Sequence, residues 1–103
     1  MSAEFSLPLD AALRHFGGAV GLTALTTMAD ARIVAVVAPD VAGGAELPER
    51  LAELGFLVGE RVRVLARAPF GDPLAVRVGS GTFALRRLEA DCIRVMPLAS
   101  SPR

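Results

Sequence analysis

The sequence predicts a mainly β (α+β) fold, a small β-barrel of about five strands with one or two short helices packed on it. Residues 50–97 begin with a short amphipathic helix that ends on a glycine. Short segments of alternating apolar and polar residues follow, separated by compact turns rich in Gly and Pro. The chain has 103 residues, a one-domain length, and its 52% apolar content suffices for one modest core.

The first half of the domain supplies one strand and one helix. Residues 32–38 (RIVAVVA) are β-branched and almost wholly apolar, which predicts a strand buried on both faces. A Gly-rich loop leads to a helix over residues 47–54, where Pro48 suits the first turn. Gly55 is placed to end the helix in the left-handed conformation, with Phe56 making the accompanying apolar contact. The leucines of this helix recur at i, i+4 and i+7 and are expected to form one buried stripe: Leu47, Leu51 and Leu54.

The second half of the domain supplies most of the sheet. Alternation predicts three meandering strands over residues 61–67, 74–78 and 82–86. One helical turn over residues 88–91 and a last strand over residues 92–96 complete the domain. This order of elements is that of an SH3-like barrel. The side chains expected to point inward from the three strands are Val62, Val64, Leu74, Val76, Val78, Phe83 and Leu85.

The domain is expected to span residues 22–98. Residues 1–21 form an N-terminal extension in which Asp10 is placed to cap a short helix, and residues 99–103 form a C-terminal tail. The uncharged run 16–29 is too short to span a bilayer, and no basic segment precedes it. We therefore expect a protein that is not embedded in a membrane and carries no signal peptide.

Four segments between residues 51 and 95 resemble one protein family. They read LAELGF, VGERVRVL, APFGDPLAVRVG and ALRRLEADCIRV, and they resemble the ferrous iron transport protein A (FeoA) family. The resemblance implies an SH3-like domain and a partner, ferrous iron transport protein B, the membrane permease with a cytosolic G-protein domain. It implies a cytoplasmic adaptor that regulates ferrous iron uptake. One departure is Thr27-Met28, which stands where family members usually carry a Pro-Gly turn.

The residue content argues against enzymatic activity. A P-loop needs the lysine of GxxxxGK[ST], and this chain has no lysine. The motifs HExxH, CxxC and GxSxG do not occur in the sequence. A Cys–His catalytic pair could come only from the single histidine, His15, and the single cysteine, Cys92, but His15 falls outside the expected barrel. The lone cysteine also fits a reducing cytosol, since no intrachain disulfide can form.

The segment APFGDP carries the candidate partner-binding residues. Pro69 and Pro73 stiffen the turn, so it would present Phe70 at little entropic cost. Asp72 is placed to bond nearby backbone N–H groups. In the alternative interpretation, Phe70 folds back over one end of the barrel. Charge complementarity to a partner is expected from Arg86 and Arg87.

Charge is divided unevenly along a chain whose net charge is zero. Residues 1–59 hold three Arg and seven acidic residues, whereas residues 60–103 hold eight Arg and four acidic residues. The basic half could form a face for an acidic partner or nucleic acid, or merely a solvated exterior. Zero net charge and the scarcity of aromatic residues disfavour nucleic acid. The arginines concerned are Arg61, Arg63, Arg77, Arg86, Arg87 and Arg94.

Glu49 and Glu53 are the candidate metal ligands, one helical turn apart, with Glu46 on the same face. They could hold a divalent ion (Fe or Zn) weakly, with help from water or a second chain in a homodimer. In the alternative interpretation this is a solvated acidic face that includes Arg50. We expect no required cofactor.

Two other functions stay open from the sequence. One is a metal-responsive regulatory module like the C-terminal SH3-like domain of iron-dependent repressors, although no pair of DNA-binding helices is apparent. The other is a small nucleic-acid-binding barrel, whose binding would depend strongly on salt.

Overall fold

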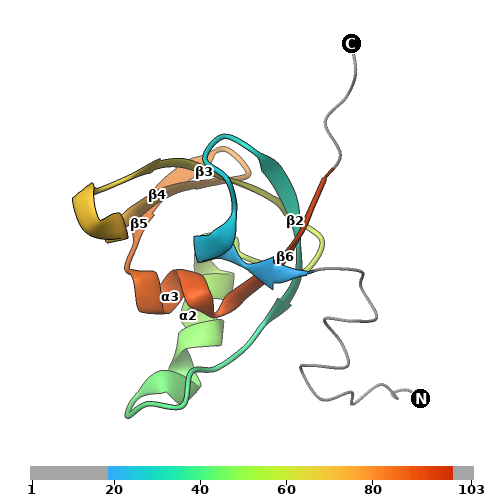
Figure 1. The fold of residues 1–103 in the computed structure, drawn as a ribbon. Coiled ribbons are helices and arrows are strands. Elements are labelled where there is room, and N and C mark those ends of the chain that lie inside the picture. Colours follow the sequence, from blue (N-terminus) through green and yellow to red (C-terminus); the bar gives the residue numbers. More distant parts are fainter. Residues whose placement is uncertain (1–18, 99–103) are drawn as a thin grey trace.

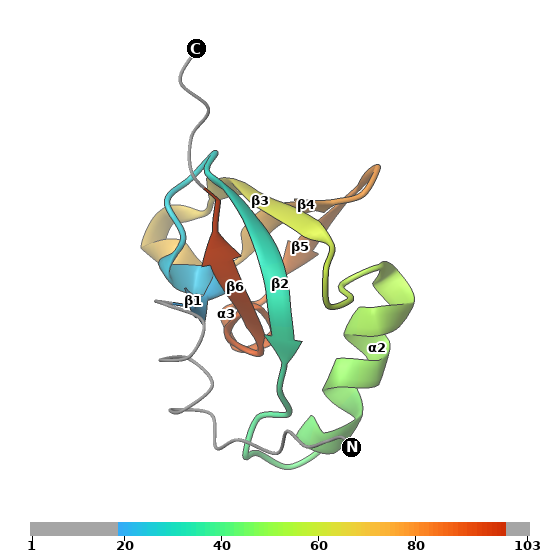
Figure 2. The same cartoon turned by 90° about the vertical axis from the view of Figure 1, so that its right-hand side faces the viewer.

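The computed structural model describes residues 19–98, in which one antiparallel sheet curls round an apolar core (Figures 1 and 2). The helix expected after Asp10, most of the N-terminal extension and the C-terminal tail lie outside the described residues. The strands are β1 (Val20–Gly21), β2 (Asp30–Val36), β3 (Arg61–Arg67), β4 (Leu74–Val78), β5 (Gly81–Leu85) and β6 (Ile93–Pro97). The helices are α2 (Leu47–Leu54), α3 (Arg87–Asp91) and the 3₁₀ helices η2 (Leu22–Ala24), η3 (Gly44–Glu46) and η4 (Pro69–Gly71).

The sheet is open, with the strand order β1-β6-β2-β3-β4-β5 and antiparallel pairing throughout. Within the described residues, β1 pairs only with β6 and β5 only with β4, so the two edge strands do not meet. The closed barrel expected from the sequence is therefore not confirmed. The sixth strand was also not expected, because β1 has two residues and so no alternation by which a sequence could reveal it.

The core lies inside the curl of the sheet and follows the predicted alternation. The predicted inward residues of β3 and β4 are all buried, as is Leu85 of β5, while Phe83 is partly buried. Ile93 and Val95 of β6 are also buried in this core, as expected. Phe56 meets Phe83 edge to face, with ring centroids 5.8 Å apart. Helix α2 lies in the lower half of both views (Figures 1 and 2).

Helix α2 has the predicted bounds, and its end explains one wrong expectation. Gly55 takes φ 114°, its N–H donates to Ala52 O at 3.0 Å, and Phe56 N–H donates to Leu51 O at 3.0 Å. This pair of bonds is a Schellman motif, which turns the chain back over the helix. Phe56, which follows the helix, is only 1% exposed and is the next buried apolar side chain after Leu51. The buried stripe ends there, so the prediction that Leu54 is buried was wrong: it is 43% exposed.

Strand β2 is buried on one face only, whereas the apolar run predicted burial on both. Ala31 and Ile33 point into the core, Arg32 is exposed, and the end of the strand is partly exposed. The strand also begins and ends two residues earlier than expected. An irregularity in its pairing with β6 falls between Ile33 and Ala35, and no helix described in residues 19–98 covers the other face of this strand (Figure 2).

The turn at Thr27-Met28, where family members usually carry Pro-Gly, takes a left-handed conformation at its second residue. Met28 takes φ 72°, a left-handed conformation that costs an L-residue roughly 1–2 kcal/mol. Its N–H donates to Val64 O at 2.7 Å, so this bond to β3 holds the backbone in place. The side chain is exposed, which leaves room for other residues at this position.

We predict that Leu51→Ala lowers the free energy of unfolding by about 2–4 kcal/mol, because it leaves a cavity in the core. Leu54→Ala should cost less than about 1 kcal/mol, because its side chain is already partly hydrated. Urea denaturation of both variants measures the difference. Equal losses would contradict the division between the buried and exposed leucines of α2.

We predict that Met28→Gly raises the free energy of unfolding by about 0.5–1 kcal/mol, since relief of the left-handed strain exceeds the entropic cost of glycine. The matched control is Thr27→Gly, at a residue without positive φ, which should lower stability. Thermal and urea unfolding measure both. A loss of stability in Met28→Gly would show that the turn is not strained.

Candidate functional site

The turn between β3 and β4 presents Phe70 to solvent. Phe70 is 99% exposed and takes φ 72°, and Gly71 follows with φ 81°. Two backbone bonds close the turn: Gly71 N–H donates to Ala68 O at 2.7 Å, and Ala68 N–H donates to Pro73 O at 3.0 Å. The alternative in which Phe70 folds back over the barrel end is therefore wrong. In Figure 1 the turn, drawn in yellow, projects to the left of the sheet.

Asp72 joins this turn to the start of helix α3. Its Oδ1 accepts a hydrogen bond from the Arg87 backbone N–H at 3.1 Å. The next bond in this segment runs from the Arg86 N–H to Glu89 Oε1 at 2.7 Å. The first N–H groups of a helix have no partner inside the helix, so these carboxylates satisfy them. The structure thus brings the turn carrying Phe70 next to Arg86 and Arg87, both of which are exposed.

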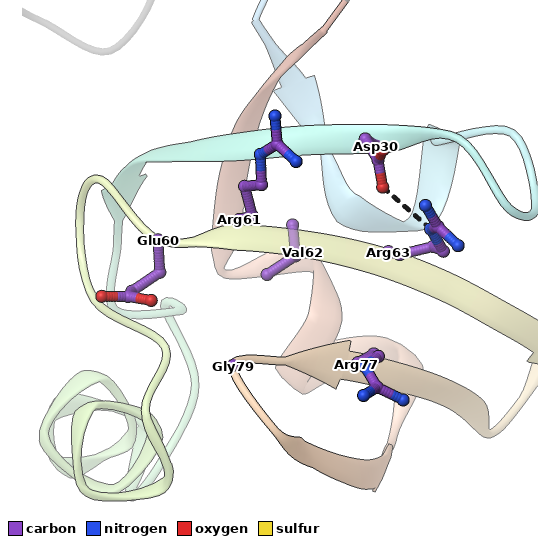
Figure 3. Close-up of a pocket in the computed structure, with 7 residues that line it drawn as sticks. All are labelled: Asp30, Glu60, Arg61, Val62, Arg63, Arg77 and Gly79. Atoms are coloured by element: carbon purple, nitrogen blue, oxygen red, sulfur yellow. Dashed lines mark hydrogen bonds and ion pairs between the residues drawn. The ribbon is translucent and has the colours of Figure 1, made fainter.

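The six arginines considered as one basic face fall into separate groups. Arg61 and Arg63 of β3 and Arg77 of β4 line one shallow cavity of about 350 Å³ (Figure 3). Arg86 and Arg87 lie at the start of α3. Arg94 lies on β6, and its Nε is buried without a hydrogen-bond partner in the described part of the chain.

Sequence reasoning missed Asp30, which is 33 residues from the arginine it pairs with. Arg63 Nε donates to Asp30 Oδ1 at 2.8 Å across the β2–β3 pair. This hydrogen bond, with the charge of Arg63, holds the pKa of Asp30 below its ordinary value. No local sequence signal indicates the pair, because it depends on the strand register.

The predicted metal ligands Glu49 and Glu53 are both exposed on α2. Glu53 shares a shallow cavity of about 220 Å³ with Glu89 of α3, and Arg50 also lines it. Within residues 19–98, no group of three or more His, Cys, Asp or Glu side chains is placed to hold a metal ion. Two exposed carboxylates beside an arginine are a weak donor set, so tight binding would need ligands from elsewhere.

Cys92 does not add to that donor set. It is buried, and its thiol lies 3.3 Å from Leu88 O, to which it donates. Burial, with Asp91 and Glu89 adding, raises the pKa of the thiol. A thiol with a raised pKa is a poor metal ligand and a poor nucleophile, because both roles need the thiolate.

The order of elements places the chain in the class of SH3-like domains: a curled antiparallel sheet, one helix between β2 and β3, and a helical turn before β6. The FeoA domain model matches residues 20–97, and the chain belongs to the FeoA family, whose role is in iron transport. This confirms the resemblance found in the sequence.

Two solved FeoA proteins are similar to the chain. FeoA from Stenotrophomonas maltophilia, solved in complex with zinc, is 40% identical over 75% of this chain and 89% of that one, with a TM-score of 0.65. FeoA from Chlorobium tepidum is 31% identical over 81% of this chain and 74% of that one, also with a TM-score of 0.65. No curated protein matches the chain.

A metal-dependent regulator shares the fold. A manganese-dependent transcriptional repressor is 25% identical over 78% of this chain and 42% of its own, with a TM-score of 0.65. The chain therefore corresponds to less than half of that repressor. None of the helices described in residues 19–98 is long and apolar enough to cross a membrane.

Proposed function

We propose that this chain is a non-enzymatic, cytoplasmic regulator of ferrous iron uptake. It binds ferrous iron transport protein B, the membrane permease, at the permease's cytosolic G-protein domain. Membership of the FeoA family supports the iron-transport role. The partner-binding residues we propose are Phe70, Asp72, Arg86 and Arg87.

The observation that carries this proposal is the exposure of Phe70 on a closed turn. An aromatic side chain left wholly in water offers about 1.5–3 kcal/mol on burial. Its left-handed backbone is unfavourable for a bulky residue, and such strain clusters at binding sites. Because backbone bonds and Asp72 already fix the turn, little conformational entropy is lost on binding.

A second function is favoured by the likeness to the manganese-dependent repressor and by the zinc complex of the Stenotrophomonas relative. In this function the domain is a metal-responsive module. Glu49 and Glu53 hold a divalent ion weakly, and a second copy of the chain supplies further ligands in a homodimer.

We predict that Phe70→Ala weakens binding to the detergent-solubilised permease by about 1–3 kcal/mol, within the range of interface anchors. Its melting temperature should change little, because the side chain contacts solvent. Val41→Ala, which trims another exposed apolar side chain, should bind normally. Titration and thermal melting measure both properties. Full binding by Phe70→Ala would end its assignment as the anchor.

We predict that any zinc-dependent dimer is lost when Glu49→Ala and Glu53→Ala are combined, with the monomer still folded. The control is Asp40→Ala, which removes an exposed carboxylate in the loop before α2. Sedimentation with and without zinc gives the oligomeric state. Zinc-driven dimers that survive the double substitution would rule out this site.

A further inference from the structure

The outer face of β2, β3 and β4 gathers arginines in register. Arg61 lies opposite Arg32 of β2, and Arg63 lies opposite Arg77 of β4. Directly opposed side chains in an antiparallel pair are about 4.5–5.5 Å apart at Cβ, and like charges there are destabilising. The face therefore holds two unfavourable cross-strand pairs that contribute nothing to the core.

Only part of this charge is neutralised within the described residues. Arg63 pairs with Asp30, whereas Arg32 keeps its charge and donates through Nη1 to the neutral Gly59 O at 2.7 Å. Arg61 and Arg77 have no carboxylate partner among residues 19–98. Two carboxylates also line the cavity: Asp30 is taken up by its pair with Arg63, and Glu60 points away from Arg61 (Figure 3).

We propose that this arginine groove, formed by Arg61, Arg63 and Arg77, binds an extended acidic segment of a protein partner with carboxylates on alternate residues. Along a strand, side chains on one face repeat about every 6.6–6.8 Å. Arg61 and Arg63 are separated by this repeat along β3, and Arg77 extends the charge to the next strand. An extended peptide laid along β3 presents alternate carboxylates at the matching interval.

Charge and composition favour an acidic peptide over nucleic acid. The chain has zero net charge, so it lacks the overall positive charge that attracts nucleic acid without regard to sequence. No aromatic side chain lines the cavity, whereas bases bound as single strands stack on aromatic rings. The planar fork of Arg matches a carboxylate with two bonds.

The probe is a labelled peptide of alternating Glu and Ser, titrated against the full chain by NMR at low salt. Shifts should concentrate on β2, β3 and β4, and added salt should weaken binding through screening. A peptide with Gln in place of Glu should not bind. A peptide with its Glu residues contiguous should bind at least threefold more weakly. These comparisons use the unaltered chain, so they do not depend on a variant folding.

The groove is then tested by combining Arg61→Ala with Arg77→Ala, which should weaken binding at least fivefold. The matched control is Arg50→Ala, which removes one exposed arginine outside the groove and should change binding less than twofold, whereas Arg61→Ala or Arg77→Ala alone should change it more. Because like-charge repulsion is relieved, the groove variant should melt no lower than the unaltered chain.

Three outcomes would overturn the proposal. One is an equal loss of binding in the control variant, which would indicate diffuse attraction. A second is tighter binding of single-stranded RNA of equal charge. The third is self-association of the free chain that the groove variant abolishes, which would assign the face to a second copy. None of these involves the permease or Phe70, so the proposed function is tested separately.

Discussion

The Schellman turn at the end of α2 is the constraint on which the rest of the domain depends. Gly55 takes a backbone conformation that a side chain would strain, and this brings Phe56 back over Leu51. Phe56 is then buried in the core and meets Phe83 of β5. The aromatic contact thus packs α2 against an edge of a sheet that does not close on itself. A residue other than glycine at position 55 would misplace the largest buried side chain of the domain.

The side chains of the core point inward, so the surfaces that can bind a partner are formed by the turns and by the outer face of the sheet. The Phe70 turn is anchored at its base by the pairing of Arg67 with Leu74 and at its side by Asp72. The arginine groove lies on paired strands of the same sheet. The backbone of both surfaces is held by strand pairing and turn hydrogen bonds, which limits the entropy lost when a partner binds.

Local patterns predicted the elements well, and long-range pairing accounts for what they missed. Alternation gave the inward residues of β3 and β4, and the proline and glycine of α2 gave both of its ends. The exposure of Leu54, the open sheet and the strand at Val20 depend on which strands meet and on where Phe56 packs. For the site, a stiff turn could be predicted from APFGDP, but the sequence left open whether Phe70 faces solvent or folds back over the barrel end. The hydrogen bond from the Arg87 N–H to Asp72, which lies 15 residues earlier, could not be predicted either, because it depends on the tertiary fold.

The two proposed surfaces differ in the physics of binding. Burial of Phe70 is apolar and little affected by salt, whereas the arginine groove acts through charges that salt screens within about 10 Å at 0.1 M. A charged surface mainly accelerates encounter and sets orientation, and an apolar anchor mainly slows dissociation. A partner that used both would be oriented by the sheet face and retained by the turn. The SH3-like fold is shared with a manganese-dependent repressor, so the function of this chain has to be argued from these exposed residues and not from the fold.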